Sequence, residues 1–373
     1  MKILIVRTFP NIINSNNYNV QEIGLAKALT MAGVQTDVVL YNGSDNDYTE
    51  LIELDDDVYI SVYHLRGFGI LKNGFFPSLR GLTSGYDVIQ VHEYDQLTSW
   101  WYYTGRDRDK VVIYHGPYYH DFNKGYNLKC RVFDRIFLKL RHNPDVIAFT
   151  KSRAAAGFLE DKGFRNTYPV GVGLDYDAFE GVDTEPMRGS GFTWIYVGKI
   201  EPRRNSIMLM KLVDRLLTDH GDMKMILVGD GDKAYKDEAL APVRKWIASG
   251  RMAYYPKLNQ TEVGELYRQA DCMLFPSNYE IFGMVLMEAM YFGLPVISSN
   301  NGGADMLIRN GENGIIVDSF ELDDWTEACE NIYNDVGLRE SIGKKLKNEQ
   351  YSLGWEVVAD KMLEVYRSRG FLK

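Results

Sequence analysis

Two glutamates on either side of a short glycine-containing segment have the spacing in this chain that best fits a chemical role. Glu280 and Glu288 are eight positions apart and follow an apolar run that closes on residues 275–277. If a helix begins near Phe282, its first amide groups lack backbone partners and lie at the positive end of the helix dipole, where phosphate binds. Eight residues of helix would hold the carboxylates roughly 12 Å and about 80° apart. One could bind a sugar and the other a ribose, with a diphosphate between them. The alternative is two solvated acids.

A loop upstream of these glutamates holds candidate ligands for the diphosphate. The apolar run at residues 194–197 is predicted to be a strand, and residues 198–205 follow it with one glycine and three cations. Glycine lets a backbone approach a ligand closely, and cations at the C-terminal end of a strand can bind phosphate oxygens. A basic surface loop is the alternative interpretation. The residues that we predict to hold the diphosphate are Gly198, Lys199, Arg203 and Arg204.

A second glycine loop matches a dinucleotide fingerprint by its letters. Residues 229–234 follow the strand-like run 225–228 and read Gly-x-Gly-x-x-Ala, so a hydride-transfer enzyme must be considered. That fingerprint also requires an acid after the next strand, but residues 252–255 are followed by Pro256 and Lys257. We therefore interpret Gly229 as part of a tight turn near a nucleotide, and we expect Lys257 and Leu258 to border the same donor site.

Two histidines in the first half of the chain each end a predicted strand. His115 is followed by a glycine, a proline and two tyrosines. An imidazole at such a strand end could hydrogen-bond a transferred sugar or stabilise charge near a leaving phosphate. His92 ends the preceding strand and is a second candidate. For either histidine, a purely structural role is the alternative.

We expect no metal and no cofactor. The sequence contains no HExxH motif, no CxxC pair and no paired histidine cluster. Residues 45–47 and 175–177 match DxD by letter only, because the first triplet lies in a polar loop and the second in an expected hinge.

Length and charge limit the class of protein. A chain of 373 residues exceeds what one hydrophobic core usually serves, and a net charge of -9 argues against a nucleic-acid binder. Three widely spaced cysteines (Cys130, Cys272 and Cys329) and an N-terminal apolar run too short for a signal peptide favour the cytoplasm.

Residues 126–142 interleave cations with apolar side chains, so this basic helix could lie on the inner face of a membrane. The alternative is a core-packing helix with a solvated basic face.

Strand-like and helix-like runs alternate along the whole chain, which predicts α/β units with parallel sheets. Strands are expected at residues 3–6, 37–41, 88–92, 111–115 and 146–150, and again at 194–197, 225–228, 252–255, 273–275, 296–298 and 315–317. A glycine- and proline-bearing stretch at 169–191 separates the two series and is expected to be a hinge. We predict two Rossmann-like domains, at 1–170 and 190–354. A helix at about 355–373 is expected to pack back on the first domain.

The C-terminal half resembles the retaining glycosyltransferases of family 4. Residues 277–296 are similar to the E-x7-E segment of that family throughout, and residues 302–303 and 311–314 fall where it has glycine turns. The resemblance implies the GT-B fold, in which two Rossmann-like domains face a cleft. It also implies that Glu280 contacts the donor sugar and Glu288 the ribose. The segment whose amides would lie near the sugar or the diphosphate comprises Ile281, Phe282, Gly283 and Met284.

The resemblance also assigns roles outside that segment, with departures. Two cations of the family bind the diphosphate. Lys199 would stand where the family has an arginine, and Arg204 where it has a lysine, so the charge is kept at each position but the residue type differs. His115 would be the N-domain histidine near the transferred sugar. Where relatives carry a Gly-Gly loop that contacts the donor phosphates and the acceptor, this chain has Asn16 and Asn17.

These observations predict a metal-independent transferase. A sugar would move from a UDP- or GDP-type nucleotide sugar to a hydroxyl of a carbohydrate or lipid-linked glycan, with retention at the anomeric carbon, in surface glycan or glycolipid synthesis. A nucleotide-sugar epimerase of the same fold and a non-catalytic sugar-nucleotide binding protein remain alternatives. An oxidoreductase comes last.

Overall fold

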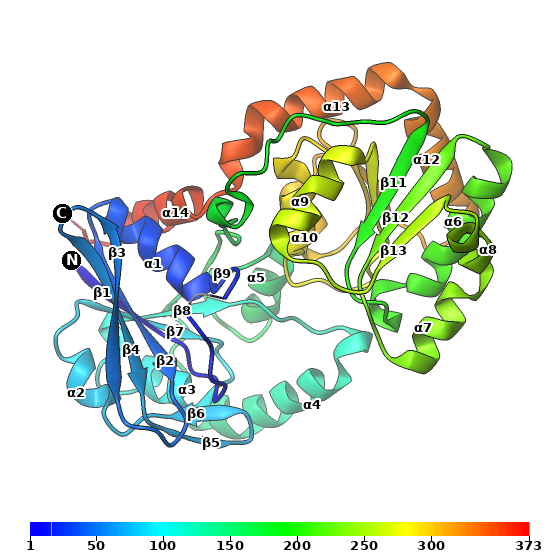
Figure 1. Cartoon of the computed structure of the whole chain (residues 1–373). Coiled ribbons are helices and arrows are strands. Elements are labelled where there is room, and N and C mark those ends of the chain that lie inside the picture. Colours follow the sequence, from blue (N-terminus) through cyan, green and yellow to red (C-terminus); the bar gives the residue numbers. More distant parts are fainter. Residues whose placement is uncertain (16, 373) are drawn as a thin grey trace. The chain divides into compact units, whose positions relative to one another are not determined.

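The computed structural model describes residues 1–15 and 17–372, which form two compact units (Figure 1). The N-terminal unit comprises Met1–Asp175 together with Gly354–Lys373, and the C-terminal unit comprises Tyr176–Leu353. The expected hinge at 169–191 is therefore divided between the units. Its second part is not a free linker, because Phe179 is buried and packs edge-on against Phe292 of the C-terminal unit, 5.2 Å between ring centroids.

An eight-stranded sheet forms the centre of the N-terminal unit, in the order β10-β9-β8-β7-β1-β2-β4-β3. Its central strands are continuous apolar runs because both faces of a parallel sheet are covered by other elements. The strands are β1 (Lys2–Val6), β2 (Gln35–Tyr41), β3 (Tyr48–Asp55), β4 (Val58–Leu65), β7 (Val88–His92), β8 (Val111–His115), β9 (Ile147–Thr150) and β10 (Asn166–Pro169), with a separate hairpin of β5 (Phe68–Ile70) and β6 (Asn73–Phe75).

The sequence predicted five of these strands, each within two residues of its observed ends, and missed the others. The antiparallel pair of β3 and β4 closes one edge of the sheet. β3 alternates between exposed and half-buried residues, so it lacks the apolar run that marks a central strand.

Helices flank this sheet, and the last helix of the chain returns to the N-terminal unit. Trp355, at the start of α14, fills a notch beside Gly24 of α1 and Gly173, where a Cβ on either glycine would lie within 2.5 Å of the indole. This confirms the predicted return of the C-terminal helix to the first domain. The helices are α1 (Gln21–Met31), α2 (Leu79–Thr83), α3 (Leu97–Thr104), α4 (Lys124–Phe133), which continues as a π-helical turn (Asp134–Leu138), α5 (Arg153–Glu160) and α14 (Trp355–Ser368), with 3-10 turns at Arg108–Lys110 and Asp121–Asn123.

The C-terminal unit is built on a six-stranded parallel sheet in the order β13-β12-β11-β14-β15-β16. In chain order this is 3-2-1-4-5-6, the Rossmann arrangement, whose direction of winding reverses between its first and fourth strands. All six strands were predicted from the sequence, within two residues of their observed ends. They are β11 (Phe192–Val197), β12 (Met223–Val228), β13 (Met252–Tyr255), β14 (Cys272–Phe275), β15 (Val296–Ser299) and β16 (Ile315–Val317).

Helices connect these strands as right-handed crossovers require. Several begin at a side-chain cap, of which the capping box of Asn259 and Glu262 at α9 is the most complete. The helices are α6 (Ser206–Asp219), α7 (Lys233–Leu240), α8 (Arg244–Ala248), α9 (Gln260–Gln269), α10 (Met284–Tyr291), α11 (Gly302–Leu307), α12 (Leu322–Asn334) and α13 (Val336–Glu349), with 3-10 turns at Tyr176–Phe179, Pro202–Arg204, Ala241–Val243 and Gln350–Leu353. Across the described residues, we find no helix with both the length and the apolar character needed to span a bilayer.

Candidate functional site

The switch point of the C-terminal sheet brings the predicted donor residues together. β11 and β14 are adjacent and parallel, with Trp194 opposite Cys272. The loop after β11 carries the predicted cations, and the loop after β14 carries Glu280. Ligands of open α/β sheets bind outside the carboxyl ends of the strands at such a reversal. The topology thus places these two loops at the position where a nucleotide is expected.

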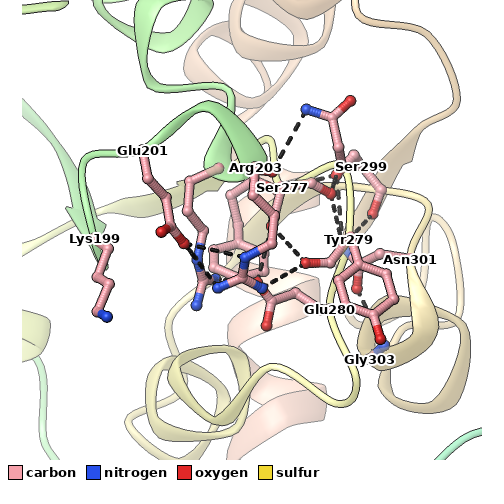
Figure 2. A network of polar contacts seen from close by, with 12 residues as sticks. Lys199, Glu201, Arg203, Ser277, Tyr279, Glu280, Ser299, Asn301 and Gly303 are labelled. Atoms are coloured by element: carbon pink, nitrogen blue, oxygen red, sulfur yellow. Dashed lines mark hydrogen bonds and ion pairs between the residues drawn. The ribbon is translucent and has the colours of Figure 1, made fainter. Parts of the chain in front are cut away.

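Glu280 is the centre of the polar network between the two loops (Figure 2). Its Oε1 atom lies 2.5 Å from Nη1 of Arg204 and 3.0 Å from Nη1 of Arg203. Ser277 donates a hydrogen bond of 2.9 Å to the same oxygen. Arg203 also donates to the carbonyl of Tyr279 at 2.7 Å and to the carboxylate of Glu201 at 2.8 Å. Two guanidinium groups are therefore fixed beside one buried carboxylate.

Arg204 is the less exposed of these two cations. Its side chain is 13% exposed, against 29% for Arg203, and its guanidinium lies over the ring of Phe275, 5.1 Å from the centroid. A cation held over an aromatic face loses little freedom when it binds a ligand, and its planar fork suits phosphate oxygens. The arrangement can stabilise negative charge without further rearrangement of the backbone.

The segment between the two glutamates differs from the helix that the sequence predicted. α10 begins at Met284, two residues later than expected, after Gly283 with φ of +82°. Only glycine adopts this conformation without strain. Glu280 therefore lies in a loop, and its separation from Glu288 does not follow from helical rise. The loop is held by close packing, because a Cβ on Gly303 would lie 1.6 Å from the carbonyl oxygen of Phe282.

Glu288 is buried on the side of α10 that faces α9. Tyr267 donates a hydrogen bond of 3.1 Å to Oε2, and Gln260 donates one of 3.2 Å to Oε1. Sequence reasoning missed both partners. Their seven-residue spacing, which places them on one face of α9, was the available signal. Gln260 follows the predicted donor residues Lys257 and Leu258 in the loop after β13, so those two residues lie near the same end of the sheet.

The glycines of the two βα loops allow close approach of backbone to backbone. Gly198 has φ of +154° and Gly229 has φ of +149°, and a Cβ on Gly229 would lie 1.8 Å from the carbonyl oxygen of Gly198. A Cβ on Gly231 would lie 2.0 Å from the carbonyl oxygen of Ile200. The carboxylate of Asp232 caps α7 by accepting from two amides of its first turn, so it occupies the position that a dinucleotide fingerprint reserves for pyrophosphate. This argues against the oxidoreductase interpretation.

Among the three cations in the loop after β11, Lys199 is the one that forms no described ion pair with Glu280. Its side chain is exposed, and its ammonium forms no ion pair with another described residue. Figure 2 shows it standing apart from the cluster, with no dashed line to the other residues. Its carbonyl is fixed by the hydroxyl of Tyr196 at 2.8 Å, so the backbone is held while the side chain can reorient.

His92 and His115 end neighbouring strands of the N-terminal sheet, and each faces a buried carboxylate. Nδ1 of His92 lies 3.2 Å from Oε1 of Glu22. Nδ1 of His115 contacts Glu93, and its ring stacks on Phe158 at 5.4 Å between centroids. Nε2 of each ring is buried without a hydrogen-bond partner among the described residues. Both histidines are thus fixed through one nitrogen, and the other nitrogen can bind a ligand only if access opens.

Burial and charge shift the pKa values around these histidines. Burial lowers the pKa of His92 to about 4, although Glu22 opposes this shift. Burial by itself would raise the pKa of Glu93, but the attraction and hydrogen bond of His115, the charge of Lys151 and the amide of Gly116 outweigh it and hold the pKa at about 2. Glu93 therefore stays ionised at neutral pH and orients the ring of His115.

Glu93 and His115, together with the buried Asp95, also have the arrangement of a potential metal site. Ligand atoms of Glu93, Asp95 and His115 all lie within 4.8 Å of one another. Spacing along the chain does not reveal this group, because two of the residues follow β7 and the third ends β8. The carboxylate of Asp95 lies 2.9 Å from the ammonium of Lys129, and Glu93 is paired with His115. The ammonium of Lys129 therefore already balances the charge of Asp95.

The predicted acceptor loop is only partly described. Asn16 lies outside the described residues, and the amide of the exposed Asn17 donates to the carbonyl of Asn14 at 3.0 Å. Ser15 donates to the carboxylate of Glu50 in β3 at 2.7 Å. A local turn and an edge strand therefore fix this loop.

The C-terminal unit matches a known family over most of its length. Residues 185–349 fit the family model described as glycosyl transferases group 1. The matching family is that of the group 1 glycosyl transferases. The match includes both loops around Glu280 as well as α9 and α10.

A D-inositol 3-phosphate glycosyltransferase of Rhodococcus jostii (strain RHA1) is 28% identical over 177 residues, which cover 46% of this chain and 39% of that protein. The chain thus spans about two fifths of that relative in the alignment.

Solved structures match over the whole chain. Sucrose-phosphate synthase from Thermosynechococcus elongatus superposes with a TM-score of 0.71 at 18% identity, over 99% of both chains. HepE of Anabaena, solved in complex with UDP-glucose, gives 0.66 at 17% identity over 99% of this chain and 100% of the other. At such identities these matches establish the fold, which is GT-B. Together with the group 1 match, they support a glycosyltransferase.

Proposed function

We propose that this chain transfers a sugar from a nucleoside-diphosphate sugar of the UDP or GDP type to an acceptor hydroxyl, with retention at the anomeric carbon and without a metal. The observation that carries this proposal is the convergence of Arg203, Arg204 and Glu280 at the switch point of the C-terminal sheet. The group 1 glycosyl transferase match over the same residues supports it. Retention rests on the sequence resemblance.

In this proposal the diphosphate competes with Glu280 for Arg204. Nη1 of Arg204 now lies 2.5 Å from that carboxylate, and a phosphate oxygen offers the same fork a second anion. As the bond to the sugar breaks, negative charge grows on the diphosphate, and Arg204 stabilises that charge. Lys199 adds a second cation when its exposed side chain turns toward the ligand. Glu280 meanwhile accepts hydrogen bonds from sugar hydroxyls, and Ser277 and Arg203 keep its carboxylate in place.

The remaining donor contacts follow from the same arrangement. The amides at the start of α10 lie after Gly283, which has no side chain to cap them, and they are proposed to bind the diphosphate or the sugar. Glu288 is proposed to bind the ribose, with Tyr267 and Gln260 orienting its carboxylate. His115 is proposed to contact the transferred sugar, and His92 to lie near the acceptor loop with Asn16 and Asn17.

The acceptor is proposed to be a carbohydrate or a lipid-linked glycan, used in surface glycan or glycolipid synthesis at the inner face of a membrane. The basic helix supports this location. Exposed apolar side chains recur along α4 and the π-helical turn among exposed Arg131, Arg135 and Lys139. Such a helix can lie in an anionic interface.

A thermal-shift screen of nucleoside diphosphates and their sugars tests the donor site. A donor at 100 times its dissociation constant should stabilise the protein by about 2.7 kcal/mol. The sugar nucleotide that stabilises is then incubated with and without acceptors. An isomeric sugar nucleotide formed without any acceptor would indicate an epimerase. Stabilisation with neither transfer nor hydrolysis would indicate a binding protein.

A further inference from the structure

An apolar pocket of about 670 Å³ opens on the surface of the N-terminal unit, and none of the residues assigned to the sugar nucleotide lines it. Its walls come from the β5–β6 hairpin, the start of α2, the helix α3 and the residues that follow α3. A pocket of this size with aromatic and aliphatic walls is typical of a site for a small apolar ligand. The apolar lining includes Phe68, Phe75, Leu79, Leu97, Trp100 and Trp101.

Large apolar side chains stand exposed in the wall of this pocket and in the hairpin that forms part of that wall. Trp101 is 64% exposed, Phe68 is 52% exposed and Ile70 is 51% exposed. The two-residue turn of the hairpin adds Leu71, which is 85% exposed. Leu71 and Lys72 both have positive φ, at 49° and 64°, in a turn where glycine and asparagine are usual. The backbone therefore holds a leucine out into solvent at a conformational cost.

The exposed stripe of the basic helix continues this apolar surface. Leu128, Val132, Ile136 and Leu140 recur every four residues and are each at least half exposed. Past Leu140, the guanidinium of Arg141 lies over the ring of Trp100 at 4.7 Å and over that of Trp101 at 5.4 Å. Trp100 also packs edge-on against Phe137, 5.2 Å between centroids. The stripe and the pocket thus meet, along the side of the unit where Figure 1 shows α4, β5 and β6.

Cations surround this apolar surface although the chain as a whole is acidic. Arg80, Arg106 and Arg141 line the pocket together with one carboxylate, that of Asp107. Residues 124–141 hold six cations and a single carboxylate. That carboxylate, on Asp134, is paired with Lys162. Lys129 is paired with Asp95, and the other five cations of this segment still outnumber its carboxylate.

We propose that this face of the N-terminal unit lies on an anionic bilayer and that the pocket takes up one hydrocarbon chain of a membrane lipid. Basic side chains beside exposed tryptophan, phenylalanine and leucine are the combination that binds at a lipid headgroup boundary. The inference goes beyond the contact by the helix alone, because it adds a site for a lipid chain. It rests on the proposed location at the inner face of a membrane and requires no sugar transfer.

Vesicles whose lipid chains carry bromine test the proposal, because bromine quenches tryptophan fluorescence on contact. Trp100 and Trp101 line the pocket, whereas Trp194, Trp325 and Trp355 are buried elsewhere and the half-buried Trp246 lies on α8 of the C-terminal unit. In the variant Trp101→Phe, the apolar rim is kept and Trp100, which is 6% exposed, becomes the reporter at the pocket. We expect anionic phosphatidylglycerol vesicles to bind this variant, and bromine near the chain ends to quench it more than bromine near the headgroups. Zwitterionic phosphatidylcholine vesicles should do neither.

Matched variants separate this face from the rest of the surface. Trp101→Ala should weaken binding to phosphatidylglycerol vesicles, whereas Leu51→Ala, at a side chain of the same 64% exposure on β3, should not. Arg80→Gln and Arg106→Gln should each lower partitioning by about fivefold. Arg165→Gln, at an exposed cation of the same unit, should leave it unchanged. Circular dichroism confirms that each variant is folded.

Three results would overturn the proposal. The first is equal binding to phosphatidylcholine vesicles, which would remove the role of charge. The second is binding to phosphatidylglycerol without quenching of Trp100 by chain-end bromine, which would leave the pocket empty of lipid. The third is quenching by monomeric bromododecyl phosphate but not by vesicles, which would indicate a soluble amphiphile. Since no sugar nucleotide is present, none of these results bears on the proposed transfer.

Discussion

Nη1 of Arg204 lies 2.5 Å from Oε1 of Glu280, so two residues that the sequence assigns to different parts of a donor form an ion pair with each other. The pair is mostly buried, with side chains 13% and 8% exposed. Removing one member of such a pair leaves the other charge without its partner. Arg203 still faces Glu280 at 3.0 Å, however, which limits that cost to the fold.

We predict that Arg204→Ala and Glu280→Ala each lower kcat by at least about 100-fold while the chain stays folded. Loss of one group that stabilises developing charge costs about 2.7–4 kcal/mol of the barrier, or roughly 100- to 1,000-fold in kcat. Arg204→Lys should recover part of the activity, because it keeps the charge but not the fork. The measurement is kcat with the donor found by thermal shift, alongside circular dichroism.

Arg215→Ala provides the matched control for that test. Arg215 pairs with Asp323 at 2.6 Å on the surface of the same unit, with side chains 37% and 88% exposed. A surface pair of this kind contributes about 0–1 kcal/mol to stability, so both kcat and folding should stay near wild type. Near-wild-type turnover in Arg204→Ala or Glu280→Ala would refute the assignment of the donor site.

The sequence could predict the frame of this site because the frame depends on local patterns. The strands β11 and β14 are apolar runs, and Gly198 and Gly283 mark the loops after them. The contacts inside the site are long-range: Arg203 binds Glu280, 77 positions away, and Gln260 binds Glu288, 28 positions away. No periodicity reports such pairs. The start of α10 was predicted two residues early for a related reason, since Phe282 belongs to a loop fixed by packing against Gly303.

We predict that Tyr267→Phe raises the KM for the donor about tenfold and changes kcat little, because a hydrogen bond to a charged group contributes about 1.5–3 kcal/mol. The hydroxyl of Tyr267 donates to Oε2 of Glu288 at 3.1 Å, and its loss leaves the proposed ribose ligand less well oriented. Tyr333→Phe is the control, since the hydroxyl of Tyr333 binds Asp222 at the surface. A KM equal to that of the wild type would argue against a ribose contact by Glu288.

We predict that EDTA leaves turnover unchanged. In the proposed mechanism, Arg204 and Lys199 supply the positive charge that a divalent ion would otherwise supply to the leaving diphosphate. The measurement is the initial rate before and after chelation and dialysis. If activity falls and Mg²⁺ or Mn²⁺ restores it, the group formed by Glu93, Asp95 and His115 becomes the first place to test, with Asp95→Asn as the variant.

We predict that His92 makes the free energy of unfolding fall as the pH drops from 6.5 toward 4. Burial lowers the pKa of His92 in the folded chain to about 4, so between these values the unfolded chain binds a proton that the folded chain does not. The contribution is complete above pH 6.5 and is lost on acidification, by on the order of 3 kcal/mol. In the folded chain, the carboxylates of Glu22 and Glu93 have pKa values of about 2 and stay ionised across this window.

Urea unfolding of the wild type and of His92→Gln at several pH values measures this effect. As the pH falls from 6.5 to 4, the unfolding free energy of the wild type should fall relative to that of the variant. Titration of groups away from His92 is common to both proteins and cancels in the difference, whereas Glu22, whose pKa His92 helps to lower, is read separately below pH 4. A difference that is constant across this window would show that His92 gains no proton on unfolding.

Gly24 and Gly157 are both helical glycines of the N-terminal unit, and we predict that alanine has opposite effects at these two positions. A Cβ on Gly157 in α5 meets no atom within 4 Å, so Gly157→Ala should stabilise the fold by about 0.5–1 kcal/mol through helix propensity. A Cβ on Gly24 in α1 would lie 2.2 Å from Nε1 of Trp355, so Gly24→Ala must displace the first residue of α14. It should destabilise the N-terminal unit by about 1–3 kcal/mol, the usual cost of overpacking. Thermal unfolding of both variants is the measurement, and equal effects would show that the C-terminal helix does not depend on this notch.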